Sequence, residues 1–528
     1  MPHPKLKYAS FFAFAAAFTA FPAGLPAQAP PVRLAPQSLK PIATVDERFQ
    51  SYNVEMIEVT GGRFWAPYKQ DMSAPADTTQ LTPGGMPASL YRYRAPLDLS
   101  NPRLRKLAAA LGPAYIRVSG TWANTTFFQD SDGPAPTKPP AGFNGVLTRD
   151  QWRGVLDFAK AVDARLVTSF AVSQGVRDGD GVWTPTEAEK VLNFTRSAGS
   201  SIAAAEMFNE PTIAAIGGAP KGYDAAAYGR DFRAFHAFIE KTDPQIKVLG
   251  PGGVGESGSL GPIPGMGFLK SEDLLNAEGP GLDAFSYHFY GAVSKRCAMM
   301  GAAGQTTPGA ALTADWLFRT DRDEAFYSAL RDRFTPGKQL WLTETGETAC
   351  GGNPWASSFL DTFRYLNQLG SLATRGVQVV MHNTLDASDY ALIDEATLTP
   401  RPNYWAAVLW RRLMGTKVLD AGTPADAGLY LYAHCLRNRP GGVALLAINA
   451  DKANPHDLDL PEKSTRYSLT SSDLLSSTVA LNGVEISLSA EDNLPALEGV
   501  AQRKGRIALA PASIVFLTVP GANNKACR

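Results

Sequence analysis

An imbalance of charge is absent from this 528-residue chain, because 50 basic residues meet 50 acidic ones. A neutral chain has no overall attraction for nucleic acid or for an anionic membrane surface. We therefore expect neither as a partner. The neutral net charge does not exclude a local basic pocket for an acidic substrate. With 45% hydrophobic and 19% charged residues, the composition excludes a mainly disordered, collagenous or coiled-coil protein.

The motifs of several enzyme classes are missing as well. There is no CxxC and no HExxH, which leaves a zinc site poorly supported, and no GxSxG marks a serine nucleophile. Residues 250–255 match GxGxxG, but the Gly-rich and Pro-rich segment after them will not start the helix that a dinucleotide phosphate requires. We expect catalysis with no cofactor and no tightly bound metal.

Long apolar runs are confined to the N-terminus. Lys5 and Lys7 precede an apolar run from Ala9 to Phe21, and small residues follow as far as Ala29. This pattern is typical of a secretory signal peptide, so we assign 1–29 to a signal with an uncertain cleavage site. The run is short for a membrane span, and an uncleaved anchor is the alternative. We expect a secreted or periplasmic protein with no membrane contact once the signal is removed.

The body of the chain alternates short β-rich runs with amphipathic helical stretches. Eight such βα units predict a (β/α)8 TIM barrel over 49–414, with a doubly wound open sheet as the alternative. The expected strands are Gln50–Glu58, Ala114–Val118, Ala164–Val172, Ala204–Asn209, Lys247–Gly250, Ala284–Tyr290, Gln339–Thr343 and Val377–Asn383.

The pattern changes on both sides of the barrel. From 415 to 528, alternating apolar and polar runs separated by turn residues predict an antiparallel β-sandwich. Its expected strands include Val479–Leu488 and Ile507–Thr518. The Pro-rich and Ala-rich lead-in 30–48 is a candidate strand of the same sandwich. The oligomeric state is not predictable from these features.

Two glutamates follow predicted strands at the end where a barrel carries its chemistry. Glu210 closes the fourth strand in Phe-Asn-Glu-Pro, and Glu344 closes the seventh in Trp-Leu-Thr-Glu-Thr. We expect these strands to face each other across the barrel, so that two carboxyl groups flank one bond, as glycosidic cleavage requires. Glu347 is a rival for the second role, although it would sit beyond the strand end. The alternative is a pair of surface or salt-bridged glutamates.

The sixth predicted strand ends in Tyr-His-Phe-Tyr, where alternation puts His288 and Tyr290 on one side. If that side faces the barrel interior, the Tyr290 hydroxyl can hold the carboxylate of the nucleophile. The alternative is a histidine and a tyrosine packed in the core.

These segments resemble glycoside hydrolase family 79 of clan A, which contains heparanase and microbial β-glucuronidases. The resemblance runs from about Phe49 to the C-terminus. Its matching segments are Gly-Pro-Ala-Tyr-Ile-Arg-Val-Ser-Gly-Thr (112–121), Phe-Asn-Glu-Pro (208–211), Trp-Leu-Thr-Glu-Thr (341–345), Ala-Cys-Gly-Gly (349–352), Gly-Val-Gln-Val-Val-Met-His-Asn (376–383), Asp-Tyr-Ala-Leu-Ile-Asp (389–394) and Leu-Asn-Gly-Val (481–484).

The resemblance implies a retaining double displacement with Glu210 as acid/base and Glu344 as nucleophile. Asn209 would contact the sugar 2-hydroxyl, and Tyr290 would be the partner of the nucleophile. The remaining implied substrate contacts are Glu55, His288 and Asn383, together with a group around the uronic acid carboxylate, namely Thr121, Gly351, Gly352 and Tyr390. Backbone N–H groups of the two glycines can approach such an anion closely.

The four cysteines fit an exported protein and permit three pairings. Cys350 stands where heparanase has a tyrosine, and it follows the seventh strand as Cys297 follows the sixth, so we predict a Cys297–Cys350 disulfide between adjacent loops. The resemblance implies a second pair, Cys435–Cys527, within the β domain. Four free thiols are the alternative.

Specificity is expected to depend on the segment Val59–Ser100, which is much shorter in heparanase and carries Phe64, Trp65, Tyr68, Tyr91 and Tyr93. A loop at this position can wall off one side of the cleft and leave a pocket for a chain end. We therefore expect an exo-β-glucuronidase. The alternatives are an endo-acting, heparanase-like enzyme on heparan-type polysaccharide, which the absence of a basic stripe weakens, and a non-catalytic carbohydrate-binding protein.

Overall fold

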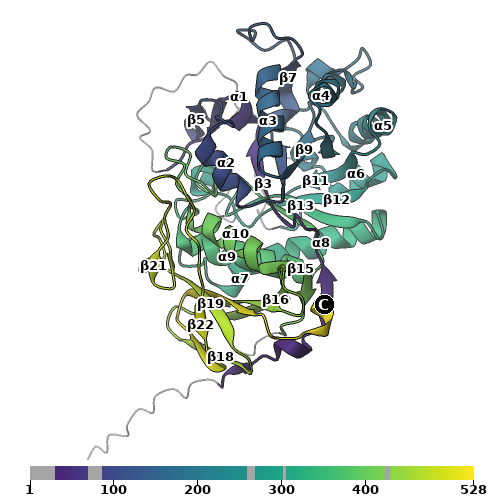
Figure 1. The fold of residues 1–528 in the computed structure, drawn as a ribbon. Coiled ribbons are helices and arrows are strands. Elements are labelled where there is room, and N and C mark those ends of the chain that lie inside the picture. Colours follow the sequence, from purple (N-terminus) through teal and green to yellow (C-terminus); the bar gives the residue numbers. More distant parts are fainter. Residues whose placement is uncertain (1–29, 69–85, 259–267, 301–304, 423–427) are drawn as a thin grey trace, which may run out of the picture.

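The computed structural model describes residues 30–68, 86–258, 268–300, 305–422 and 428–528. Its ribbon shows a barrel with a smaller β domain packed beneath it (Figure 1). The predicted signal peptide lies outside the described residues. None of the helices in the described part of the chain is long and apolar enough to cross a membrane.

Eight parallel strands close into the predicted barrel, which excludes the open doubly wound sheet. Their inner and outer faces are both covered, so they consist mostly of apolar runs. Around the barrel they follow in the order β3 (Gln50–Glu55), β6 (Ala114–Ser119), β9 (Ala164–Ser169), β10 (Ile202–Glu206), β11 (Lys247–Gly253), β12 (Ala284–Tyr290), β13 (Gln339–Gly346) and β14 (Val379–His382).

Helices cover the outside of the barrel. Thr148 and Gln151 form a capping box that starts α3, and Asn101 caps α2 ahead of a proline in its first turn. The helices of this layer are α2 (Pro102–Ala109), α3 (Arg149–Ala161), α4 (Thr186–Ser197), α5 (Ala225–Thr242), α6 (Ser271–Glu278), α7 (Ala314–Leu317), α8 (Arg319–Phe334), α9 (Phe359–Thr374) and α10 (Pro402–Leu413).

The first barrel strand is shorter than predicted. The sequence indicates a strand to Glu58, but β3 ends at Glu55 and a short helix, α1 (Met56–Thr60), begins there. The Glu58 carboxylate accepts a hydrogen bond from the Glu55 backbone N–H at 2.6 Å, which closes a capping box. The β-branched residues Ile57 and Val59 concealed this helix start.

Several short elements follow the carboxyl ends of the first, second and fourth strands and rise above the barrel mouth (Figure 1). After β3 comes an antiparallel pair, and after β6 a parallel pair. These elements are β4 (Gly62–Trp65) with β5 (Tyr91–Arg94), β7 (Thr126–Gln129) with β8 (Gly145–Thr148), and the 3-10 turn η6 (Pro211–Ile213) after β10.

The C-terminal domain consists of two sheets that enclose an apolar core, which is a sandwich. The large sheet runs β2 (Pro41–Thr44), β15 (Met414–Leu419), β16 (Leu429–Leu436), β17 (Val443–Asn449), β24 (Ser513–Val519), β19 (Ser464–Thr470), β20 (Ala480–Leu481) and β21 (Val484–Glu485), with β22 (Val500–Gln502) paired to β19. The small sheet contains β1 (Val32–Arg33), β18 (His456–Leu460) and β23 (Gly505–Leu509). The lead-in therefore supplies one strand to each sheet.

Two expected strands of this domain are each divided by a turn, into the hairpin β20–β21 and into β23 and β24, which belong to different sheets. Asn482 and Gly483, with φ of 52° and 87°, turn the chain between β20 and β21, so Val479–Leu488 is not one strand. An Asn-Gly pair favours this turn because both residues tolerate positive φ. Likewise Ile507–Thr518 divides into β23 and β24 at Ala512, where φ is 45°.

The large sheet packs on the barrel through α9. The hydroxyl of Tyr432 in β16 donates to Asn367 Oδ1 at 2.7 Å. Gly370 in α9 lies against the same ring, and a Cβ at this position would come within 2.4 Å of it. The sandwich therefore packs against the side of the barrel through α9 (Figure 1).

Candidate active site

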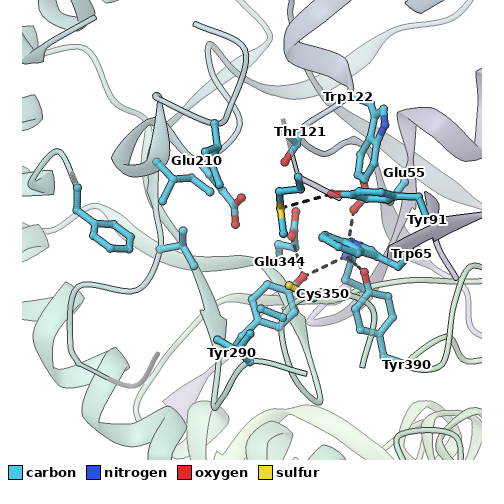
Figure 2. Close-up of a pocket in the computed structure, with 18 residues that line it drawn as sticks. Glu55, Trp65, Tyr91, Thr121, Trp122, Glu210, Tyr290, Glu344, Cys350 and Tyr390 are labelled. Atoms are coloured by element: carbon cyan, nitrogen blue, oxygen red, sulfur yellow. Dashed lines mark hydrogen bonds between the residues drawn. The ribbon is translucent and has the colours of Figure 1, made fainter. Parts of the chain in front are cut away.

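A cavity of about 110 Å³ opens at the carboxyl end of the barrel. Side chains from β3, β12, β13 and from loops after β6, β10 and β14 reach into it, and the β4–β5 pair forms one wall (Figure 2). The polar residues that line it are Glu55, Tyr91, Thr121, Glu210, Tyr290, Glu344, Asn383 and Tyr390.

Glu344 is held by donors to both of its carboxylate oxygens. Arg117 Nη1 donates to Oε2 at 2.9 Å, and the Tyr290 hydroxyl donates to Oε1 at 2.7 Å. A guanidinium and a phenol in these positions fix the orientation of the carboxylate. Glu344 is therefore suited to act as a nucleophile.

Glu210 has a different environment. It lies four residues beyond the end of β10, in a left-handed backbone conformation (φ 56°, ψ 59°) that caps η6. Burial raises the pKa of its carboxyl to about 7, against the opposing charge of Arg117. A carboxyl group that is still about half protonated at neutral pH can act as a general acid.

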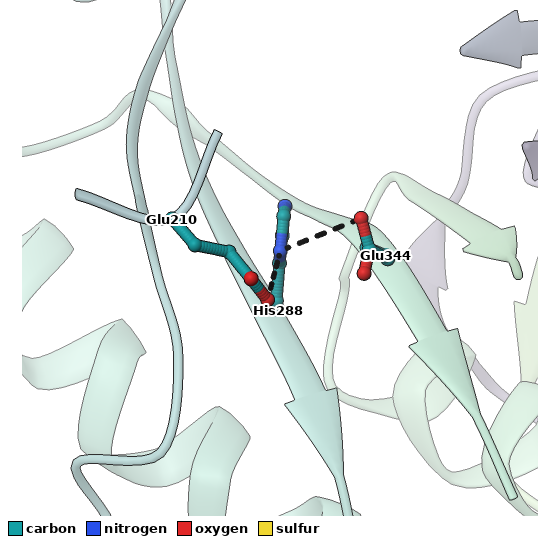
Figure 3. Close-up of side chains that lie close together, drawn as sticks. All are labelled: Glu210, His288 and Glu344. Atoms are coloured by element: carbon teal, nitrogen blue, oxygen red, sulfur yellow. Dashed lines mark hydrogen bonds and ion pairs between the residues drawn. The ribbon is translucent and has the colours of Figure 1, made fainter. Parts of the chain in front are cut away.

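His288 links the two glutamates (Figure 3). Its Nδ1 lies 3.1 Å from Glu210 Oε1, and its Nε2 lies 3.3 Å from Arg117 Nη2. Burial lowers the pKa of His288 to about 4, so the ring is neutral. Since a guanidinium can only donate, Nε2 accepts, and Nδ1 carries the hydrogen toward Glu210.

The two carboxylates approach closely, with an oxygen of Glu210 and an oxygen of Glu344 within 4.8 Å of each other. Retaining glycosidases hold their carboxyl groups about 5–5.5 Å apart, and inverting enzymes about 6.5–9.5 Å. The expectation that strands four and seven face each other was wrong, because β11 and β12 alone separate β10 from β13. The pair still meets because Glu210 lies on the loop that follows its strand and turns toward Glu344 (Figure 3).

Arg117 in β6 connects most of the site, and the sequence analysis did not select it. Besides Glu344, it binds Glu206 through Nε at 2.9 Å and Asn209 through Nη2 at 2.7 Å. Burial favours protonated Glu206, but the Arg117 guanidinium outweighs it and lowers the pKa of that carboxyl. Arg117 is the one charged residue in a strand of otherwise uncharged residues, and this was the signal that could have identified it.

Asn209 lies beneath the cavity. Its Oδ1 accepts from Arg117, and its backbone exchanges hydrogen bonds with the Asn124 side chain at 3.0 Å. Its Nδ2 is buried and has no partner among the described residues. This N–H group is oriented by the Arg117 contact, but Asn209 does not line the cavity, so its contact with the sugar 2-hydroxyl stays a prediction.

Asn383 organises the opposite side. Its Nδ2 lies 3.0 Å from Glu55 Oε1 and 3.1 Å from the hydroxyls of Tyr290 and Tyr390. Burial, and then the charge of Glu344, raise the pKa of Glu55 well above its usual value. Its Oε2 lies so close to Gly120 that a Cβ there would overlap it at 1.5 Å, so this position requires glycine.

Glu347, the rival nucleophile, does not line the cavity. Its Oε2 accepts from the Thr348 hydroxyl and from the Asn353 backbone N–H, both at 2.8 Å. The strand ends at Gly346, so this side chain supports the loop behind the site.

Comparison with known proteins places this geometry in a family. The N-terminal domain of glycosyl hydrolase family 79 matches residues 92–260. Heparanase of Rattus norvegicus is 28% identical over 496 residues, 81% of this chain and 87% of the relative. Baicalin-β-D-glucuronidase of Scutellaria baicalensis is 25% identical over 472 residues, 80% of this chain and 84% of the relative.

The matching domain and the relatives support glycoside hydrolase family 79. The chain is a glycoside hydrolase, which accounts for the paired carboxyl groups at the barrel mouth. A 4-O-α-L-rhamnosyl-β-D-glucuronidase structure from Fusarium oxysporum superimposes with a TM-score of 0.61 at 13% identity, over 93% of this chain and 99% of that one. That likeness supports the fold, a barrel with a β domain.

Four residues of this glycoside hydrolase were predicted to surround a uronate carboxylate. Thr121 and Tyr390 line the cavity, whereas Gly351 and Gly352 do not. Gly351 packs against Trp65 and Ser388, and the Gly352 N–H already donates to the Thr348 carbonyl at 3.2 Å. Thr121 and Tyr390 therefore lie where a bound sugar could reach them. The contacts of all four residues with a uronate carboxylate stay a prediction.

The disulfides join Cys297 to Cys350 and Cys435 to Cys527, with Cα separations of 6.5 and 5.3 Å. The first bridge connects the loops after β12 and β13. Cys350 itself lines the catalytic cavity, so this bridge holds part of the cavity wall.

Aromatic rings from the segment after β3 form another part of the wall (Figure 2). Trp65 stacks on Tyr91 with ring centroids 4.6 Å apart, and Trp122 meets Trp65 edge-on at 6.5 Å. The Tyr91 hydroxyl donates to Met86 Sδ at 3.5 Å. Phe64 is buried beneath, while Tyr93 stays exposed.

Proposed function

We propose that this hydrolase removes terminal β-linked glucuronic acid with retention of configuration at the anomeric carbon. The observation that carries the proposal is the contrast within the carboxyl pair. Glu210 is buried and its pKa is raised to about 7, whereas Glu344 accepts hydrogen bonds from the Arg117 guanidinium and the Tyr290 hydroxyl. Such a contrast assigns the acid and the nucleophile in a retaining glycosidase.

In the first step an oxygen of Glu344 attacks the anomeric carbon while Glu210 donates its proton to the departing glycosidic oxygen. This gives a covalent glycosyl ester on Glu344 and a free alcohol. In the second step Glu210, now a carboxylate, takes a proton from water, and the resulting hydroxide displaces Glu344 from the sugar. Tyr290 and Arg117 stabilise the carboxylate that leaves.

The uronic acid preference is supported by the relatives' names, which include baicalin-β-D-glucuronidase, heparanase and the hyaluronoglucuronidase of Hirudo nipponia. Within the cavity we assign the uronate carboxylate to the hydroxyls of Thr121 and Tyr390, which line it. The described lining residues include no lysine or arginine, so neutral hydrogen-bond donors would hold this anion.

Exo action is supported by the wall of Trp65, Tyr91 and Met86, which narrows the cavity on one side. We also propose export of the protein, on the strength of the N-terminal leader pattern and two disulfides. The endo-acting reading of the same chemistry predicts chain shortening of heparan by the purified protein. Exo action predicts release of free glucuronic acid without shortening.

The proposal is tested with nitrophenyl β-glucuronide, with nitrophenyl β-glucoside as the control substrate. Turnover of the glucuronide alone is expected, and Glu344→Gln should abolish it. Glu347→Gln is the matched control and should retain activity, because Glu347 lies outside the cavity. Equal turnover of both sugars would refute the uronate preference, and an active Glu344→Gln enzyme would refute the mechanism.

A further inference from the structure

A buried arginine joins four of the loops at the mouth of the barrel. Arg296 follows β12, directly before Cys297, and its side chain is only 6% exposed. Its guanidinium donates to the Ala66 carbonyl, to the Gly352 carbonyl at 3.4 Å and to the Asp389 carboxylate. The loops after β3, β13 and β14 are thereby held against the loop that follows β12.

The ion pair of Arg296 and Asp389 lies directly behind the wall of the catalytic cavity. Asp389 immediately precedes Tyr390, which lines the cavity and to which we assign the uronate carboxylate. Tyr390 lies across the cavity from Glu210 (Figure 2), and Glu210 is on the side of the leaving group in the proposed reaction. Arg296 itself does not line the cavity, so it can act on the bound sugar only through this wall.

Tyr68 fixes the guanidinium in place. Its ring centroid lies 4.2 Å from the central carbon of the Arg296 guanidinium, which is a cation–π contact. Its hydroxyl accepts from the Arg296 backbone N–H at 2.6 Å and lies 3.0 Å from Ser294 Oγ. Its own backbone N–H donates to Asp389 Oδ2 at 3.2 Å. Because an arginine keeps its charge even when it is buried, a fixed positive charge stands behind the wall.

This charge acts on the Tyr390 hydroxyl. Burial, and then the charges of Glu55 and Glu344, raise the pKa of Tyr390 well above its usual value. The Arg296 guanidinium opposes that rise. In buried surroundings water screens a charge weakly, so its effect extends over several ångströms. An anion bound at Tyr390 would therefore be stabilised by Arg296 without touching it.

We infer that Arg296 is a positioning residue that gives the cavity its preference for a uronate over a neutral sugar, an inference that rests on the proposed function. The described residues that line the cavity include no lysine or arginine. The charge of Arg117 is already matched by Glu206 and Glu344. Arg296 supplies positive charge from behind the wall, and its partner Asp389 limits that charge. The balance of this ion pair sets how strongly the site favours an anion.

The test neutralises each member of the ion pair separately. Arg296→Gln leaves the negative charge of Asp389 behind the wall, whereas Asp389→Asn leaves the positive charge of Arg296. Both variants break the same ion pair, so structural damage alone would act in the same direction in both. The matched controls are Arg333→Gln and Glu272→Gln, which break an exposed ion pair between α8 and α6. The measured quantity is the ratio of kcat/KM between nitrophenyl β-glucuronide and the uncharged nitrophenyl β-glucuronamide.

Arg296→Gln should lower this ratio about tenfold or more, and Asp389→Asn should raise it about threefold or more. Both controls should leave the ratio within about twofold of wild type. A fall of the ratio in both variants, or no change in either, would overturn the inference, and if one variant fails to fold, the direction of change in the other decides. A wild-type enzyme that does not hydrolyse the glucuronide, or that hydrolyses both substrates equally, would instead refute the proposed function.

Discussion

The assignment of Glu210 as the general acid makes a prediction about leaving groups. The rise of its pKa from 4.5 to about 7 corresponds to roughly 3 kcal/mol in favour of the protonated form. Above that pH the acid is ionised, so kcat/KM of the wild type should fall on the basic side. Glu210→Gln removes proton donation and should slow hydrolysis of an alkyl β-glucuronide by about 10²–10⁴.

A leaving group that departs without protonation isolates the effect. With dinitrophenyl β-glucuronide, the first step in Glu210→Gln should stay near the wild-type rate and lose its basic limb. The second step should become limiting, which gives a burst of dinitrophenol, and azide should then accelerate turnover and yield β-glucuronosyl azide. Rapid-mixing absorbance measures the burst. An equal loss on alkyl and dinitrophenyl substrates, or an unchanged basic limb, would refute the role of Glu210.

Three further results are expected. Tyr290→Phe removes the hydrogen bond to the Glu344 carboxylate, worth about 1.5–3 kcal/mol, so kcat/KM should fall roughly 10–150-fold. The melting temperature should drop by no more than a few degrees. Steady-state kinetics measures the first quantity and calorimetry the second. Replacing Cys297 and Cys350 by serine opens a loop of sequence separation 53. The free energy of unfolding should drop by about 4 kcal/mol on the chain-entropy model, and KM should rise. An unchanged denaturation midpoint would argue against the bridge. Because the pKa of Glu210 is raised on folding, its ionisation destabilises the fold as pH rises from 4.5 through 7. The melting temperature of Glu210→Gln should therefore exceed that of wild type above pH 7 but not below pH 4.5. A constant difference across this range would contradict the raised pKa.

The barrel was predictable because its strands are buried apolar runs separated by capped helices. All eight strands were identified, and errors arose where local signals compete. Ile57 and Val59 favour a strand, yet the Glu55–Glu58 capping box starts a helix. At 482–483 an Asn-Gly turn interrupts an alternating pattern that continues on both sides.

The proximity of Glu210 and Glu344 was also predictable, since each glutamate lies at the carboxyl end of a predicted strand and belongs to a distinctive segment. The difference between the two carboxyl groups was not, because it depends on side chains distant in the sequence. Arg117 reaches Glu344 across 227 positions, and burial of Glu210 arises from the closed barrel.

The central claim, that Glu344 is the nucleophile of a retaining β-glucuronidase, is tested most directly by trapping the covalent intermediate. A 2-deoxy-2-fluoro-β-glucuronyl fluoride should inactivate the enzyme and label it once. Trypsin cleaves after Lys338 and after Arg364, so both Glu344 and Glu347 lie in one peptide. Fragmentation of this peptide by tandem mass spectrometry then locates the sugar. We predict the label on Glu344. A label on Glu347, or inactivation without a covalent adduct, would contradict the mechanism.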